Sequence, residues 1–163
     1  MIWRTEDETK MTKIIAERLT QMSKDELIKI IKLLCNNKSS FQKVSLLVAP
    51  TQKDLERAIS RFDSCCDRFY CNSESESTFD EFVEKANLLL IAADKAGSDM
   101  QANIYYEMLR SIRSYQLYVY CDDGIAEFQY CAEDELKEII DKHGDEFSDA
   151  MLKKYKSVIS YSD

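Results

Sequence analysis

The stretch TQKDLERAISRFDSCCDRF, residues 51–69, decides the fold class. Its apolar side chains recur every three or four residues, which is the spacing of one face of an α-helix. Thr51, which follows Pro50 directly, and Asp54 have the spacing of a helix cap. The stretch therefore predicts an amphipathic helix that buries the following side chains: Leu55, Ala58, Ile59, Phe62, Cys65, Cys66 and Phe69.

Similar patterns extend along the chain. Ser23 and Glu26 form a capping-box sequence before the strongly apolar run 27–34, which we expect to be a central helix. Further helical patterns occupy 11–22, 78–93 and 98–112 and follow Gly144. Gly (3) and Pro (1) are rare, which favours long helices. The sequence predicts a mainly α protein, a single globular domain over residues 1–163 built as a bundle of about six helices.

Residues 117–130, LYVYCDDGIAEFQY, leave two interpretations open. The Asp123-Gly124 pair between aromatic and β-branched runs is a strong signal for a short β-hairpin. A turn there would pair Cys121 with Ala126 and Leu117 with Tyr130, so that apolar side chains share one face. The alternative continues the preceding helix to about Cys121 and breaks it at the glycine. The register favours the hairpin slightly.

The composition and the N-terminal sequence bound the class of protein. Apolar residues make up 45% and charged residues 32% of the 163 residues, which is typical of a globular chain. No run approaches the roughly 18 apolar residues of a membrane span, and the first ten residues lack the apolar stretch of a signal peptide. Six cysteines without a CxxC pair suggest reduced thiols. We therefore expect a cytoplasmic protein without a membrane partner.

Residues that carry common chemistries are sparse. His143 is the one histidine, so the chain alone cannot form a di-iron site that needs two histidines. A zinc site would also lack a second Cys/His pair at ligand spacing. The three glycines lie far apart, and the sequence has no GxxxxGK[ST] or GxGxxG motif. We predict no catalytic residues, no metal and no cofactor.

The net charge of −8 is unevenly distributed. Residues 1–62 hold twelve Lys/Arg and eight Asp/Glu, a net of +4, whereas residues 122–149 hold two Lys/Arg and eleven Asp/Glu, a net of −9. Six of the nine tyrosines fall between Tyr105 and Tyr130, beside this acidic segment. A dense acidic surface attracts a basic partner and opposes nucleic acid. Tyrosines beside charge are common at protein interfaces.

The leading functional hypothesis is a non-enzymatic, acidic protein-binding domain. Its concrete form is an inhibitor, such as an immunity protein or antitoxin, that covers the active-site groove of a basic, nuclease-type toxin. The partner would be a basic protein and not a nucleic acid. The expected partner-binding residues are Tyr118, Tyr120, Asp122, Asp123, Glu127, Glu133, Asp134, Glu135 and Glu138.

Two other classes of function stay open. A viral or bacterial helical adaptor or effector would bind a host or regulatory protein through an apolar groove, with the acids only solubilising the chain. A cysteine-dependent enzyme would need a thiol that meets His143 in space. Alanine scanning separates the adaptor from the acidic inhibitor, and the rate of thiol labelling tests the enzyme.

Overall fold

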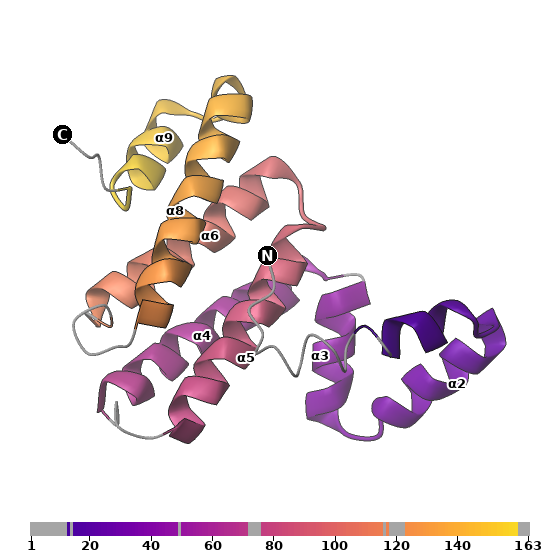
Figure 1. Cartoon of the computed structure of the whole chain (residues 1–163). Helices are drawn as coiled ribbons and strands as arrows, with labels where there is room; N and C mark the ends of the chain where they lie inside the picture. The colour runs from indigo at the N-terminus through magenta and orange to yellow at the C-terminus, as the bar shows by residue number, and fades with distance from the viewer. Residues whose placement is uncertain are drawn as a thin grey trace.

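The computed structural model describes residues 13, 15–48, 50–71, 76–115, 117 and 123–159. Every regular element in these ranges is a helix, so the predicted mainly α fold class is confirmed (Figure 1). None of these helices is both long and apolar enough to cross a membrane. The named elements are α2 (Lys24–Leu34), α3 (Lys38–Val48), α4 (Gln52–Cys71), α5 (Glu76–Ala93), α6 (Ser98–Ser114), α8 (Asp123–His143), the 3-10 turn η1 (Gly144–Glu146) and α9 (Asp149–Lys156).

Two predicted helix starts are confirmed in detail. The Ser23 side chain accepts a hydrogen bond from the Glu26 backbone N–H at 3.3 Å, and the Glu26 carboxylate accepts one from the Ser23 N–H at 2.9 Å. Thr51 and Asp54 make the same reciprocal pair before α4, with both N–H···O distances at 3.2 Å. Each pair satisfies backbone N–H groups that a helix leaves unpaired at its first turn.

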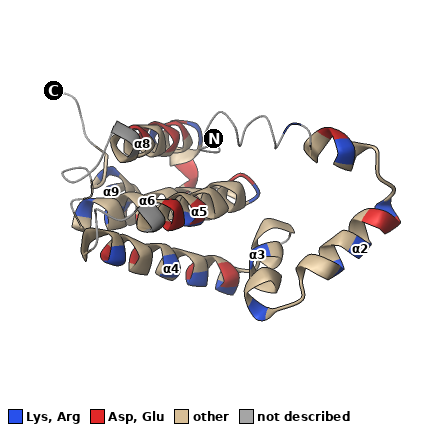
Figure 2. Ribbon diagram, turned by 60° about the horizontal axis from the view of Figure 1, so that its bottom comes forward, with Lys and Arg blue, Asp and Glu red and all other residues tan. Residues whose placement is uncertain are grey.

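The bundle is layered around α6. Helix α4 packs along α5 and α6, while α8 packs along α6. Figure 2 shows α8 at one edge of the bundle and α4 at the opposite edge, with α5 and α6 between them. The short helix α9 also lies against α6. This arrangement leaves the outer faces of α4 and α8 toward solvent.

The core is aromatic where α4, α5 and α8 meet. The Phe82 ring of α5 lies 5.4 Å from Phe62 and 6.0 Å from Phe69 of α4, measured between ring centroids. It also meets Phe128 of α8 edge-on at 5.7 Å. Tilted and edge-on arrangements are the favoured geometries for aromatic pairs. Phe82 therefore joins three helices at one point.

The hairpin interpretation of residues 117–130 is wrong for its second half, because residues 123–130 form the first two turns of α8. Residues 118–122 lie outside the described part of the chain. Ile125 and Phe128 are buried, and they continue at helical spacing to Ala132 and Leu136 on the core-facing side of α8. Burial of this extended stripe outweighs the local turn preference of Asp123-Gly124.

Helix α2 is not the central helix that its composition suggests, because none of its residues is buried. It packs against α3 and projects from the rest of the bundle, as Figure 1 shows. Leu33 is 74% exposed and Leu34 is 58% exposed. Exposed apolar side chains continue onto α3 at Phe41 and Val48. The N-terminal helices therefore present an apolar surface to solvent.

Candidate functional site

The acidic residues of α8 fall largely on its outer face. Glu127, Asp134, Glu138 and Asp141 are exposed, and their spacings of seven, four and three residues place them along one side of the helix. Figure 2 shows acidic positions recurring along α8 at the edge of the bundle. Tyr130 lies among them and is 65% exposed. We call Glu127, Tyr130, Asp134, Glu135, Glu138 and Asp141 the α8 outer surface.

Glu133 points elsewhere, although it lies between members of this surface in sequence. It is 2% exposed and accepts a hydrogen bond from the Arg113 guanidinium of α6 at 2.6 Å. Gln129 Nε2 donates a second bond to the same oxygen at 2.8 Å. A buried carboxylate with a cationic partner ties two helices together. Glu133 therefore fixes α8 on α6 and does not contribute to the outer surface.

The remaining predicted binding residues divide into three groups. Glu135 is exposed beside the acidic row and belongs to the α8 outer surface. Asp123 is the first residue of α8, but its side chain is not described. Tyr118, Tyr120 and Asp122 lie outside the described residues. The structure thus brings together Glu127, Asp134, Glu135 and Glu138 from the predicted set.

Two lysines moderate the charge of this surface. Lys137 Nζ lies 3.2 Å from the Asp134 carboxylate one turn away. Lys142 forms an ion pair with Glu138, which raises the pKa of the lysine through hydrogen bonding and charge. Exposed pairs of this kind contribute little to stability. The surface keeps five carboxylates against these two lysines, so its field remains negative.

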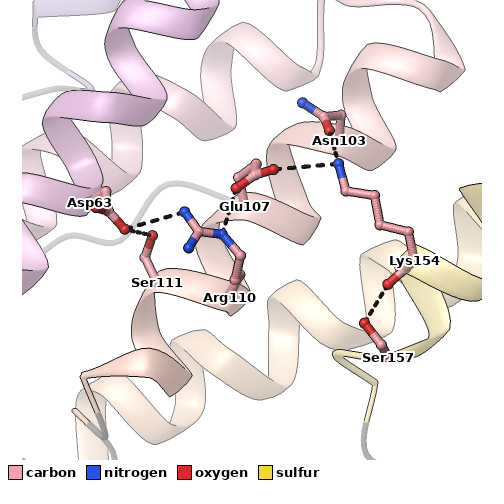
Figure 3. Close-up of polar contacts among 7 residues, drawn as sticks. All are labelled: Asp63, Asn103, Glu107, Arg110, Ser111, Lys154 and Ser157. Carbon is pink, nitrogen blue, oxygen red and sulfur yellow. Dashed lines mark hydrogen bonds and ion pairs between the residues drawn. The ribbon is translucent and has the colours of Figure 1, made fainter.

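A second polar cluster links α4, α6 and α9 (Figure 3). Ser111 Oγ donates to Asp63 Oδ1 at 2.6 Å, and Arg110 lies 3.4 Å from the same oxygen. Arg110 Nε also donates to Glu107 at 2.7 Å, and the Glu107 hydrogen bond raises the pKa of the guanidinium. These contacts fix α6 against α4.

The same cluster continues from Glu107 to α9. Lys154 Nζ donates to Asn103 Oδ1 at 2.9 Å and lies 3.4 Å from Glu107. It also stands 4.3 Å from the centre of the Tyr106 ring, a cation–π contact. Cations and carboxylates alternate through the cluster, so each charge has an opposite partner. This arrangement is typical of helix attachment, and we assign the cluster that structural role.

The thiols of Cys65 and Cys66 are not activated nucleophiles, and the hydrogen-bond partner of His143 is a carboxylate. Burial raises the pKa of Cys65 to about 11 and that of Cys66 further. His143 Nδ1 is instead 3.1 Å from the Glu146 carboxylate. A high thiol pKa leaves little thiolate at neutral pH, and the thiolate is the nucleophile. Within the described ranges, no group of three or more His, Cys, Asp or Glu side chains is placed to hold a metal.

Sequence reasoning missed Tyr130 and Asp141 as members of the α8 outer surface. The hairpin interpretation places Tyr130 opposite Leu117 on an apolar face, and Asp141 is not among the expected partner-binding residues. The signal that identifies them is their helical spacing from Glu127 and Asp134. This spacing can be recognised only when residues 123–143 are known to form one continuous helix.

Comparison with known proteins finds no matching family model, no matching curated protein and no matching solved structure.

Proposed function

We propose that this chain is a non-enzymatic protein-binding domain that engages a basic protein through the α8 outer surface. The supporting observation is the row of exposed carboxylates along α8 with the exposed ring of Tyr130 among them. Carboxylates provide long-range attraction to a cationic surface, and an exposed tyrosine provides contact area with little loss of conformational entropy. The concrete form we propose is an inhibitor, such as an immunity protein or antitoxin, that covers the groove of a nuclease-type toxin.

The test is affinity capture from the native cell with the whole chain as bait at low salt. We expect a basic protein to be captured and then released as salt rises, because screening shortens the reach of surface charges to about 10 Å at 0.1 M ionic strength. The double variant Asp134→Lys/Glu138→Lys should lose the partner. The control Glu56→Lys changes an exposed carboxylate on α4 and should retain it. Capture that is insensitive to both salt and charge reversal contradicts the proposal.

A second candidate is an adaptor that binds through the apolar surface of the N-terminal helices. It is favoured by the exposure of Leu33, Leu34 and Phe41 and by the absence of any buried residue in α2. Large exposed apolar patches mark interaction surfaces. Residues 13–48 carry seven Lys/Arg and three Asp/Glu, a net of +4, so the matching partner surface is apolar and acidic.

Alanine substitutions separate the two candidates on the same captured partner. Leu33→Ala and Leu34→Ala should abolish capture if the adaptor proposal holds, and Asp134→Ala should leave it intact. The acidic-inhibitor proposal expects the opposite pattern. These side chains are exposed, so each substitution should alter stability by no more than about 0.5 kcal/mol and leave the fold intact.

A further inference from the structure

A small pocket opens where α3, α4 and α5 meet, away from the α8 outer surface. Its volume is about 60 Å³. Since one water needs a cavity on the order of 10–15 Å³, the pocket has room for a few waters or one small oxyanion. Leu46 and Leu88 line it with apolar surface, and Leu46 is 5% exposed. The pocket is therefore a small site with an apolar wall.

The polar lining of the pocket is mainly basic. Four cations from three helices reach it, namely Lys43, Arg57, Arg61 and Lys85. Asp54 is the carboxylate in the lining. It already accepts hydrogen bonds from the Thr51 hydroxyl and backbone N–H, and the hydroxyl is the main cause of its lowered pKa.

Glu84 lies beside the pocket and pairs with both lysines. Burial acts to raise the pKa of Glu84, but Lys43 and Lys85 outweigh it and lower that pKa. Counting Glu84 with the lining, four cations face two carboxylates, a net of +2 in a chain of net charge −8.

Arg61 has guanidinium N–H groups that could donate to a ligand in the pocket. Its Nη2 donates to the Gln42 side-chain oxygen at 2.5 Å. No described carboxylate lies within ion-pair distance of this guanidinium. Arg57 lies one helical turn earlier on the same side of α4. Its contact with Asp54 is loose, with 3.8 Å between Arg57 Nη1 and Asp54 Oδ1. Two guanidinium groups at this spacing, with Lys43 and Lys85 opposite, match the several oxygens of a tetrahedral oxyanion.

We propose that this pocket binds the phosphate group of a small molecule. The guanidinium groups of Arg57 and Arg61 would hold the phosphate oxygens, and the lysines would add charge. Leu46 and Leu88 would contact an apolar part of the ligand next to the phosphate. The pocket is too small for a nucleotide to enter whole, so the rest of a larger ligand would lie outside it.

The test is calorimetric titration of the full chain with inorganic phosphate and with phenyl phosphate, at constant ionic strength set by chloride. We expect saturable 1:1 binding of both, with phenyl phosphate bound more tightly because its ring adds apolar contact. Arg61→Gln should weaken phosphate binding about tenfold, since it removes one charged, forked donor. Arg68→Gln is the matched control, because Arg68 lies further along α4 and pairs with Glu81.

Folding does not confound this test, because Arg61 is exposed and circular dichroism checks that each variant keeps its helix content. Arg57→Gln provides an independent second variant with the same expected loss. Absence of saturable phosphate binding by the wild type would overturn the proposal. So would equal affinity in the wild type, Arg61→Gln and Arg57→Gln, or an equal loss in Arg68→Gln, since either pattern shows binding that does not depend on the pocket.

Discussion

Replacing Glu133 by alanine should destabilise the fold far more than replacing its neighbour Glu135 by alanine. The first carboxylate is 2% exposed and paired with Arg113, whereas the second is exposed on the α8 outer surface. The two substitutions remove the same chemical group, one residue apart in the same helix. Their difference therefore measures the environment of Glu133 rather than helix propensity.

The magnitude follows from the burial of the pair. Removing one member of a buried ion pair costs about 3–5 kcal/mol, because the other charge stays in a poorly solvated place. The Arg113 side chain is 28% exposed, so water offsets part of this cost. We expect Glu133→Ala to lower the free energy of unfolding by about 2–3 kcal/mol, and Glu135→Ala to change it by at most about 0.5 kcal/mol.

Urea unfolding followed by far-ultraviolet circular dichroism measures this difference directly. For a chain of this length the expected loss corresponds to a melting temperature lower by about 4–12 °C. The double variant Glu133→Leu/Arg113→Met should recover most of the stability, because buried pairs are often replaceable by apolar groups of similar volume. Equal stability of Glu133→Ala and Glu135→Ala would refute the assignment of Glu133 to helix attachment.

Three further outcomes are expected. Phe82→Ala should cost about 3–5 kcal/mol in urea unfolding, because its buried ring meets three others, whereas Phe41→Ala, at a ring 59% exposed, should cost about 0.5 kcal/mol or less. The pKa of Asp54 is lowered, so its contribution to stability is complete above its unfolded-state pKa, about 3.9, and is lost as pH falls through the folded-state pKa. Between neutral and acid pH, Thr51→Ala should therefore lose less free energy of unfolding than the wild type. A thiol reagent at neutral pH should label exposed Cys71 before the buried thiols, and the reverse order would contradict their burial.

Local sequence signals predicted the helix starts and the core-facing stripes. The capping pairs at Ser23 and Thr51 act within a few residues, so their geometry is legible without the rest of the fold. The apolar stripe of α4 was predicted for the same reason, and Phe62, Cys65, Cys66 and Phe69 are buried as expected.

Two predictions failed because tertiary packing overrode local preference. The Asp123-Gly124 sequence favours a turn, yet burial of Ile125 and Phe128 against the bundle supports a helix that starts there. The apolar composition of α2 predicted a central helix, but none of its residues is buried. Composition alone does not determine whether another helix of the chain packs over an apolar helix.

The candidate site was predicted in part. Charge counting located the acidic segment, and Glu127, Asp134, Glu135 and Glu138 do share the outer side of α8. The direction of Glu133 could not be foreseen, because it depends on the position of Arg113 in another helix. The basic pocket combines residues from three helices and leaves no motif in the sequence.

The attachment of α2 through α3 has a consequence for the order in which the chain opens. A helix with no buried residue has few contacts to lose when it unwinds, so it can melt while α4, α6 and α8 stay folded. Amide hydrogens of α2 should therefore exchange with deuterium through a local opening of low free energy. Those of α6 should exchange only when the whole domain unfolds. A protease that cuts unwound chain should accordingly trim residues 15–34 first and leave a resistant remainder.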